Sequence, residues 1–378
     1  MPVYKMPGSK DGKQKYRVRI NYTDKNGVPH QLDRVAYGST EAKMLESQLL
    51  REYGKGGDAA NARMTVQELY DAYMAAKKHE VRATTYDKTR RNLKRYVLPI
   101  LGNHRLDRLN AAALQNWKQN IAGAGLTVTT QQNQYTELRT MLNFAVKMEY
   151  LPRNPLISVG NFKDTDFTPP KDKLHYYTPE QFLKYIAAAR TYAEAENTLA
   201  AWGYYVFFAI AYYTGMRKGE INALKWSDID GSVINVRRSV SQKIKGEAIV
   251  ETPPKNKTSY RTLQMPQPLM EILNEHRNRQ TQMTAYSEDF RVCGGEHCLR
   301  DTSISNKNIQ FADAAGLPHI RIHDFRHSHA SLLANEGINI QEIARRLGHA
   351  KIEQTWNTYA HLYPREEERA VQILDRVK

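Results

Sequence analysis

The segment Ile157–Tyr176 divides the sequence into parts with different patterns. It is polar and charged and contains Pro169 and Pro170, a composition typical of a linker between domains. The residues before it, from about Met64, have helical periodicity, whereas the residues after it alternate helical segments with a cluster of strands. A length of 378 residues fits about two to four domains of ordinary size. We therefore expect a multidomain protein rather than one continuous core.

Residues 1–57 predict a small three-stranded sheet with one helix. The segment 16–22 alternates strictly between apolar and polar residues, which gives it one apolar face. The opposite face carries Arg17, Arg19 and Asn21. The predicted elements are strands over 3–6, 16–22 and 28–37, a turn over 23–27 and a helix over 39–53. The glycine-rich segment Gly54–Asp58 then separates this module from the next domain.

Residues 63–156 predict a helical domain with an excess of positive charge. Thr65-Val66-Gln67-Glu68 is a capping-box sequence that begins the first helix. The other predicted helices start near Thr84 and cover 111–122 and 128–150, and the last one has a polar stripe of Gln131, Gln134, Arg139, Asn143 and Lys147. Residues 62–160 contain 15 Lys and Arg against 7 Asp and Glu, which is more than half of the chain's net charge of +15. Such stripes are often solvated helix faces, but this charge favours a polyanionic partner such as nucleic acid.

Cysteine content and hydropathy exclude two other classes of protein. The two cysteines, Cys293 and Cys298, cannot form a disulfide framework, so we expect a reducing compartment. The N-terminus lacks the apolar stretch of a signal peptide. The longest apolar run, Tyr204–Tyr213, is about half as long as a membrane span and predicts a buried core helix. We therefore expect a cytoplasmic protein without a membrane segment.

Residues 177–378 predict a third domain that carries most of the chemically suggestive residues. Thr178-Pro179-Glu180-Gln181 begins its first helix with a second capping box, and strands are expected over 232–241, 248–252 and 261–265. Four unusual combinations then follow in order. They are Thr214-Gly215-Met216-Arg217-Lys218-Gly219-Glu220, the basic turn Pro254–Arg261 with Lys257, His323-Asp324-Phe325-Arg326, and Leu347-Gly348-His349 with Tyr359 ten residues after the histidine.

Taken together and in this order, the four combinations resemble the tyrosine recombinase family, the integrases of phages and conjugative elements. Each motif alone is weak, but four in order within one domain-sized span are specific. The two segments before the linker resemble the integrase architecture by pattern only. The resemblance implies a multidomain, mainly α fold: an arm-type DNA-binding domain over 1–57, a helical core-binding domain over 63–156, a linker over 157–176, and an α+β catalytic domain with a C-terminal tail over 177–378.

The resemblance also implies a role for each motif residue. Tyr359 is the nucleophile, because a tyrosine hydroxyl can hold the broken DNA strand as a phosphate ester. Arg217 and Arg326 stabilise the negative charge of the pentavalent transition state by charge-assisted hydrogen bonds. The other roles are His349 as a donor to the phosphate, His323 as proton acceptor or phosphate ligand, Lys257 as the acid for the leaving 5′ oxygen, and Glu220, Asp324 and His361 as supporting residues.

Two of these assignments have competitors among nearby residues. Lys255 lies on the same basic turn as Lys257, and we favour Lys257 because a small polar pair and a basic strand start follow it. Arg217 and Arg326, taken as isolated arginines, would be structural ion-pair partners of neighbouring acidic residues. Within the family resemblance those acidic residues position the arginines.

A zinc site is the other alternative. His323 and His327 have the spacing of zinc ligands on a helix, but the glutamate of a HExxH motif is absent and an arginine lies between them. Cys293, His297 and Cys298 form a cluster without a matching second pair. We expect no metal and no other cofactor.

The sequence thus predicts a site-specific DNA recombinase of a mobile element. It would cut and rejoin DNA through a 3′-phosphotyrosine intermediate and a four-way junction, as a homotetramer on core-type and arm-type attachment sites. The residues expected to contact duplex DNA are Arg17, Arg19, Asn21, Lys88, Arg91, Arg95, Gln131 and Arg139. By resemblance, a DNA-bending protein and an excisionase are expected helpers, and the protein is expected in the cytoplasm with the nucleoid.

Two rival functions share most of these features. A housekeeping recombinase that resolves chromosome dimers has the same catalytic set but usually lacks the sheet module of residues 1–54. A catalytically inactive DNA-binding regulator keeps the fold and the charge but loses active-site residues. All six predicted catalytic residues are present here, namely Arg217, Lys257, His323, Arg326, His349 and Tyr359.

Overall fold

The computed structural model describes residues 3–23, 29–53, 64–164, 174–242, 250–252, 260–363, 371 and 374–376. The chain divides into two compact units, Met1–Phe167 and Thr168–Lys378. Parts of the expected linkers and turns lie outside the described residues, among them 24–27, 54–58, Pro169 and Pro170, and both Lys255 and Lys257. Within the described ranges, no helix is long and apolar enough to cross a membrane.

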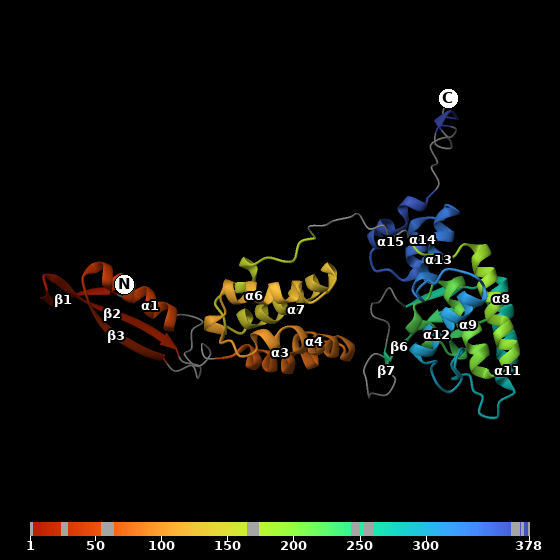
Figure 1. Ribbon diagram of the computed structural model, residues 1–378, viewed down its shortest axis with the longest axis horizontal. Coiled ribbons are helices and arrows are strands. Elements are labelled where there is room, and N and C mark those ends of the chain that lie inside the picture. Colours follow the sequence, from red (N-terminus) through yellow and green to blue (C-terminus); the bar gives the residue numbers. More distant parts are fainter. Residues whose placement is uncertain are drawn as a thin grey trace. The chain divides into compact units, whose positions relative to one another are not determined.

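The N-terminal module is the predicted sheet with one helix. Strands β1 (Val3–Lys10), β2 (Lys13–Thr23) and β3 (Pro29–Tyr37) are antiparallel in the order β1-β2-β3, and α1 (Ser39–Tyr53) packs on the sheet (Figure 1). Val18 and Ile20 are buried, as their alternation predicted, and they share a core with Ala36, Ala42 and Leu49.

The helical part of the first unit has its own core. Its helices are α3 (Val66–Glu80), α4 (Ala83–Tyr96), α5 (Leu98–Leu101), α6 (Ala111–Ala122) and α7 (Val128–Lys147), with short 3₁₀ turns η1 (Leu106–Arg108) and η2 (Pro155–Ser158). The capping box of α3 is formed: Thr65 N donates to Glu68 Oε2 at 2.7 Å, and Glu68 N donates to Thr65 Oγ1 at 3.2 Å. Helix α7 ends three residues before the predicted end, and Glu149 just beyond it has a φ of 60°.

One residue of the predicted polar stripe on α7 faces inward. Gln134 is buried, beside Tyr135 and Leu138 in the core, whereas Arg139 is exposed. A polar residue within the stripe therefore belongs to the interior of the bundle, and the solvated face of α7 is narrower than predicted.

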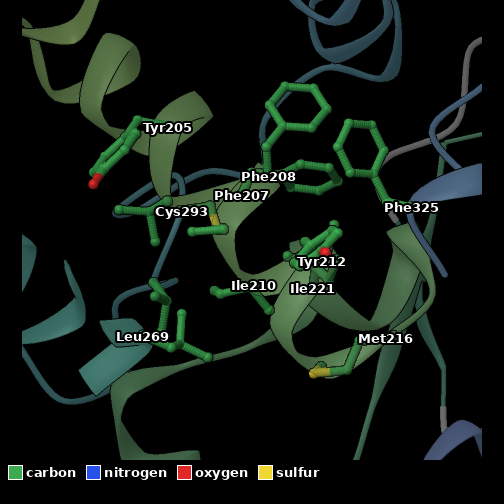
Figure 2. Packing of buried hydrophobic residues seen from close by; sticks show 14 of the residues in the cluster. Tyr205, Phe207, Phe208, Ile210, Tyr212, Met216, Ile221, Leu269, Cys293 and Phe325 are labelled. Carbon is green, nitrogen blue, oxygen red and sulfur yellow. The ribbon is translucent and has the colours of Figure 1, made fainter. Parts of the chain in front are cut away.

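The second unit is built around the apolar run seen in the sequence. This run lies within α9 (Leu199–Thr214), which is buried along most of its length. The other helices are α8 (Pro179–Glu196), α10 (Lys218–Ala223), α11 (Gln267–Thr281), α12 (Asp301–Ala314), α13 (Asp324–Asn335), α14 (Ile340–Leu347) and α15 (Ile352–Tyr359), with 3₁₀ turns η3 (Trp226–Asp228) and η5 (Ala360–Leu362). Figure 2 shows the aromatic side chains at the centre, where the rings of Phe208 and Phe325 lie 5.3 Å apart. This core holds the start of α13 against α9.

The strand cluster forms two sheets rather than one. Strands β4 (Ile229–Asp230), β5 (Val233–Val236) and β8 (Arg261–Gln264) pair in the order β4-β5-β8, whereas β6 (Ser239–Ser241) pairs with β7 (Val250–Thr252). The single strand predicted over 232–241 is therefore wrong. It breaks at Arg237 and Arg238, and the Arg238 guanidinium contacts the buried carboxylate of Asp228 at 3.2 Å.

Candidate active site

Arg217 lies at the turn between two helices, where the sequence pattern predicted a break. Gly215 ends α9 with a φ of 63°, a left-handed conformation that favours glycine, and Arg217 is the N-cap of α10. The Arg217 backbone N–H donates to Glu220 Oε2 and its Nη1 donates to Glu220 Oε1, both at 2.9 Å. The Arg217 side chain is 38% exposed. Glu220 therefore binds one side of the guanidinium, and the other side is open to solvent.

Glu220 also binds a second arginine that the sequence analysis did not select. Arg261 Nη2 donates to Glu220 Oε2 at 2.8 Å, and both side chains are only 4% exposed. Burial raises the pKa of Glu220, but the charges of Arg261 and Arg217 outweigh it and hold this pKa below its usual range. Glu220 is therefore a buried carboxylate that orients Arg217.

Three guanidinium groups donate to backbone carbonyls at the C-terminal end of α14. Arg261 Nε donates to the carbonyl of Arg346 at 2.7 Å, Arg326 Nη2 to that of Leu347 at 2.6 Å, and Arg217 Nη2 to that of Gly348 at 3.2 Å. These three consecutive carbonyls stand at a helix end, where the backbone dipoles favour positive charge. Gly348 has a φ of 66°, which ends the helix and leads directly into His349. The Leu-Gly-His motif thus provides a shared scaffold for the two predicted arginines and the histidine.

Arg326 is the more deeply buried of the two predicted arginines. It is 3% exposed, and its Nη1 donates to the carbonyl of Gly215 at 2.8 Å. Burial, followed by repulsion from Arg217 and Arg261, lowers the pKa of Arg326 to about 9. The guanidinium is still charged at neutral pH, and an anion bound beside it would relieve both effects.

His349 is the residue after Gly348, and a buried threonine binds its imidazole ring. Its Nδ1 lies 2.8 Å from Thr355 Oγ1, and Thr355 is fully buried. Burial, together with the charges of Arg326 and Arg217, lowers the pKa of His349 to about 3. The imidazole is therefore neutral at physiological pH, with one ring nitrogen fixed by Thr355 and the other free to serve as a donor.

Tyr359 lies at the end of α15 and contacts a histidine of α13. It is 1% exposed, and its Oη lies 2.6 Å from Nδ1 of His327. Burial raises the pKa of Tyr359 to about 12, although the charge of Arg326 acts in the opposite direction. Sequence reasoning weighed His327 only as a zinc ligand and chose His361 as the helper of Tyr359. No local signal in the sequence distinguishes His327 as a partner of Tyr359, because the contact depends on how α13 packs against α15.

The other predicted site residues are the supporting Asp324 and His361 and the catalytic His323. Asp324 is buried, but its carboxylate accepts from the backbone and guanidinium of Arg321 rather than from Arg326. His323 is exposed at the start of α13, with its ring perpendicular to that of His327 at 5.1 Å. His361 is exposed in η5. The structure therefore brings together Arg217, Arg326, His349 and Tyr359 through α13, α14 and α15, which lie side by side in Figure 1.

All three sheet residues expected to contact DNA are engaged in cross-strand contacts. Arg19 Nε donates to Asp33 Oδ1 at 2.8 Å, and Asn21 Oδ1 accepts from Gln31 at 3.1 Å. Arg17 lies 3.9 Å from the same Asp33 carboxylate. These side chains lie opposite the apolar face, as predicted, and the ion pairs are exposed to solvent.

The helical candidates for DNA contact are mostly exposed. Lys88, Arg91 and Arg95 all lie on the surface of α4, and Arg91 Nε donates to Asp87 at 2.8 Å. Gln131 is half-buried, and its side chain donates to the carbonyl of Leu126 at 2.8 Å. This hydrogen bond stabilises the start of α7.

Protein-family models match both units of the chain. The phage integrase family model matches residues 176–366, which is half of the chain, and a model described as the N-terminal SAM-like domain of phage integrases matches residues 65–121.

Two curated relatives are similar over nearly their whole length. The chain is 26% identical to the ICEBs1 integrase of Bacillus subtilis, over 90% of this chain and 91% of the relative. It is 25% identical to the transposase of transposon Tn916 from Enterococcus faecalis, over 93% of this chain and 89% of the relative.

Solved structures share the fold. The Tn1549 transposon integrase in complex with a circular intermediate DNA has a TM-score of 0.65 at 19% identity, and the match covers 83% of this chain and all of that one. A lambda integrase tetramer bound to a Holliday junction has a TM-score of 0.57 at 16% identity and covers 97% of both chains.

Proposed function

Because the chain belongs to the phage integrase family, we propose that Tyr359 attacks a DNA phosphodiester and holds the broken strand as a 3′-phosphotyrosine ester. The protein is a tyrosine recombinase, and its activity is the site-specific recombination of a mobile element. The ester conserves the free energy of the broken bond, so the strand can be joined to a new partner without an external energy source.

The observation that carries this assignment is the cluster at the end of α14. Arg326 and Arg217 donate to the consecutive carbonyls of Leu347 and Gly348. His349 is the next residue in the chain. Burial, together with the charges of the neighbouring arginines, lowers the pKa values of Arg326 and His349, which is the expected state of an anion site without its anion. A phosphate of the DNA backbone is the anion that we assign to it, with His349 and His323 as further ligands.

Lys257 is our candidate for the acid that protonates the leaving 5′ oxygen. This assignment rests on the sequence motif alone, and Lys255 is its competitor. A substrate with a 5′-bridging phosphorothiolate has a leaving group that needs no proton, so it should restore cleavage to the alanine variant of the true acid. Rescue of Lys255→Ala but not of Lys257→Ala would reverse the choice.

We also propose that four protomers act on two duplexes and pass through a four-way junction. The lambda integrase neighbour forms a tetramer on a Holliday junction. In this proposal the exposed Lys88, Arg91, Arg95 and Arg139 bind the phosphates of the core site, and the sheet of residues 3–37 binds a separate arm site. A DNA-bending protein and an excisionase are expected helpers, and we expect such an enzyme in the cytoplasm with the nucleoid.

A covalent-capture experiment tests the proposed function. A nicked duplex that carries the core site, identified from the flanking repeats of the element, should trap a protein–DNA adduct that resists denaturation. Tyr359→Phe should abolish this adduct while gel-shift binding stays within about twofold, because the variant lacks only a hydroxyl. Cleavage should persist in excess EDTA, since no metal has a role. An adduct formed by the Phe variant would show that Tyr359 is not the nucleophile.

A further inference from the structure

We propose that His327 is the catalytic residue that accepts the phenolic proton of Tyr359 when the phenolic oxygen attacks the phosphate. The inference rests on the proposed role of Tyr359 as the nucleophile. Its basis is the 2.6 Å separation between Nδ1 of His327 and Oη of Tyr359, with ring centroids 5.8 Å apart. Among the described residues this is the one side-chain hydrogen bond of Tyr359, and in the proposal the phenolic hydroxyl donates it to Nδ1.

The protonation states fit this direction of proton transfer. The pKa of Tyr359 is raised, so its hydroxyl carries a hydrogen at neutral pH and donates it. Burial, with smaller effects of Arg321 and Arg326, lowers the pKa of His327, and the opposing effect of Asp324 does not cancel them. His327 is therefore a neutral imidazole with a lone pair on Nδ1, which is the form that a general base needs.

The helix geometry explains why His327 and Arg326 reach different targets. The two residues are consecutive near the start of α13, so their side chains diverge by about 100° around the helix axis. Arg326 turns inward to the carbonyls of Gly215 and Leu347, whereas the half-buried His327 turns to Tyr359. One turn of helix thus supplies both a guanidinium for the phosphate and an acceptor for the nucleophile's proton.

Among the described residues, the charged groups that act on His327 are Asp324, Arg321 and Arg326, and none of them is hydrogen-bonded to its Nδ1. The Asp324 carboxylate is occupied by Arg321, with its Oδ2 accepting from the Arg321 backbone at 2.8 Å. The ring of His323 is perpendicular to that of His327 at 5.1 Å, a packing contact between two imidazoles.

The proposed step balances as follows. The bond from Tyr359 Oη to phosphorus forms while the bond from phosphorus to the 5′ oxygen breaks. The phenolic proton passes to Nδ1 of His327, and the leaving oxygen takes a proton from the general acid, assigned above to Lys257. During rejoining the transfers reverse, and His327 returns the proton to Tyr359 as the phenolic oxygen leaves.

Single-turnover cleavage of the nicked core-site duplex tests the proposal with two variants. His327→Ala removes both the hydrogen bond and the base, and adduct formation should slow by about 100-fold or more. In His327→Asn the side-chain oxygen can accept the same hydrogen bond but cannot take the proton. This variant should stay slow, and its rate should rise with pH as hydroxide replaces the base. Wild-type cleavage should lose this pH dependence once His327 is neutral.

The controls separate the possible failures. His319→Ala, which removes an exposed histidine of the same domain, should cleave at the wild-type rate. Gel-shift binding and thermal unfolding check that each variant is folded and binds DNA. A wild-type rate in His327→Ala, or a wild-type rate and pH profile in His327→Asn, would overturn the role of His327 as proton acceptor. An adduct formed by Tyr359→Phe would instead overturn the proposed function.

A spectroscopic measurement of the His327 ring nitrogens tests the direction of the hydrogen bond without relying on a cleavage rate. In protein with ¹⁵N-labelled histidine, Nδ1 of His327 should appear as the unprotonated ring nitrogen and should shift when Tyr359 is changed to Phe. The signal is assigned by its loss in His327→Asn. A protonated Nδ1 in the neutral imidazole would contradict the proposal, because that nitrogen then donates to Tyr359 instead of accepting from it.

Discussion

Arg261 and Glu220 form a buried ion pair that joins strand β8 to helix α10, with 2.8 Å between Nη2 and Oε2. The two residues are 41 positions apart in the sequence. Through the other oxygen of Glu220 the pair also fixes Arg217, at 2.9 Å. Arg261 therefore acts on Arg217 through a shared carboxylate and orients the guanidinium that we assign to the phosphate.

Arg261→Met should destabilise the second unit strongly. It leaves the buried Glu220 carboxylate with Arg217 as its remaining guanidinium partner, and removal of one partner of a buried ion pair costs about 3–5 kcal/mol. The double variant Arg261→Met, Glu220→Leu also removes the buried carboxylate and should lose less than the single variant. Urea unfolding followed by tryptophan fluorescence measures both free energies. A loss below about 1 kcal/mol for Arg261→Met would contradict the buried-pair interpretation.

The Thr355 hydroxyl should control the activity of His349. When it donates to Nδ1, the hydrogen of the neutral ring stays on Nε2, which can then donate to a phosphate. Thr355→Val keeps the shape but loses the hydroxyl, and adduct formation should fall about fivefold, since a hydrogen bond contributes about 1 kcal/mol. Thr355→Ser keeps the hydroxyl and should stay near the wild-type rate. Equal rates for the two variants would show that the hydroxyl does not orient His349.

Local signals in the sequence predicted the elements well. The capping boxes at Thr65 and Thr178 are both formed, and the strict alternation around Val18 produced a strand with one buried face. These features depend on residues three or four positions apart or on a period of two, so the sequence contains them directly. The candidate site residues were instead selected from the order of the motifs, and their catalytic roles stay predictions.

Contacts between distant elements could not be predicted in this way. Arg261 was taken only as the basic start of a strand, because its carboxylate partner is far away in the sequence. His327 was missed since its role depends on how α13 packs against α15, whereas the predicted helper His361 is close to Tyr359 only along the chain. Gln134 was assigned to a polar surface because a stripe alone does not define the edge of the buried face.

Gly215→Ala should be far more costly than the same change at another left-handed glycine. Gly215 has a φ of 63°, and an added Cβ would lie 2.8 Å from a ring carbon of His329 and 2.9 Å from a side-chain carbon of Leu347. Gly231 has a φ of 54° and no atom within 4 Å of an added Cβ, so Gly231→Ala measures the backbone strain alone. That strain is about 1–2 kcal/mol.

The difference between these two variants isolates the packing contribution at Gly215. We expect Gly215→Ala to lose about 1–3 kcal/mol more than Gly231→Ala in urea unfolding, because the crowded interior must shift. The Gly215 carbonyl accepts from Arg326, so cleavage should also slow in the first variant and not in the second. Equal losses in the two variants would mean that the interior at Gly215 accommodates a methyl group.

His276 should make the stability of the second unit fall as the pH drops below about 6.5. It is fully buried, its Nε2 lies 2.8 Å from the carbonyl of Val292, and its Nδ1 has no hydrogen-bond partner within the described ranges. Burial lowers the pKa of His276 to about 4; the nearby Arg279 adds to this effect, whereas the Val292 carbonyl and Glu275 oppose it.

The sign of this effect follows from the two states. Between pH 6.5 and about 4, the unfolded chain binds a proton at His276 that the folded chain excludes. The contribution of His276 to the free energy of unfolding therefore decreases by about 1.4 kcal/mol for each pH unit in this window, or about 2 kcal/mol at pH 5. His276→Gln keeps an amide donor for the Val292 carbonyl but does not titrate, so its stability should decrease less steeply. Urea unfolding of both proteins at pH 8, 6.5, 5.5 and 5 measures the difference, and parallel curves would show that His276 does not contribute to the acid sensitivity.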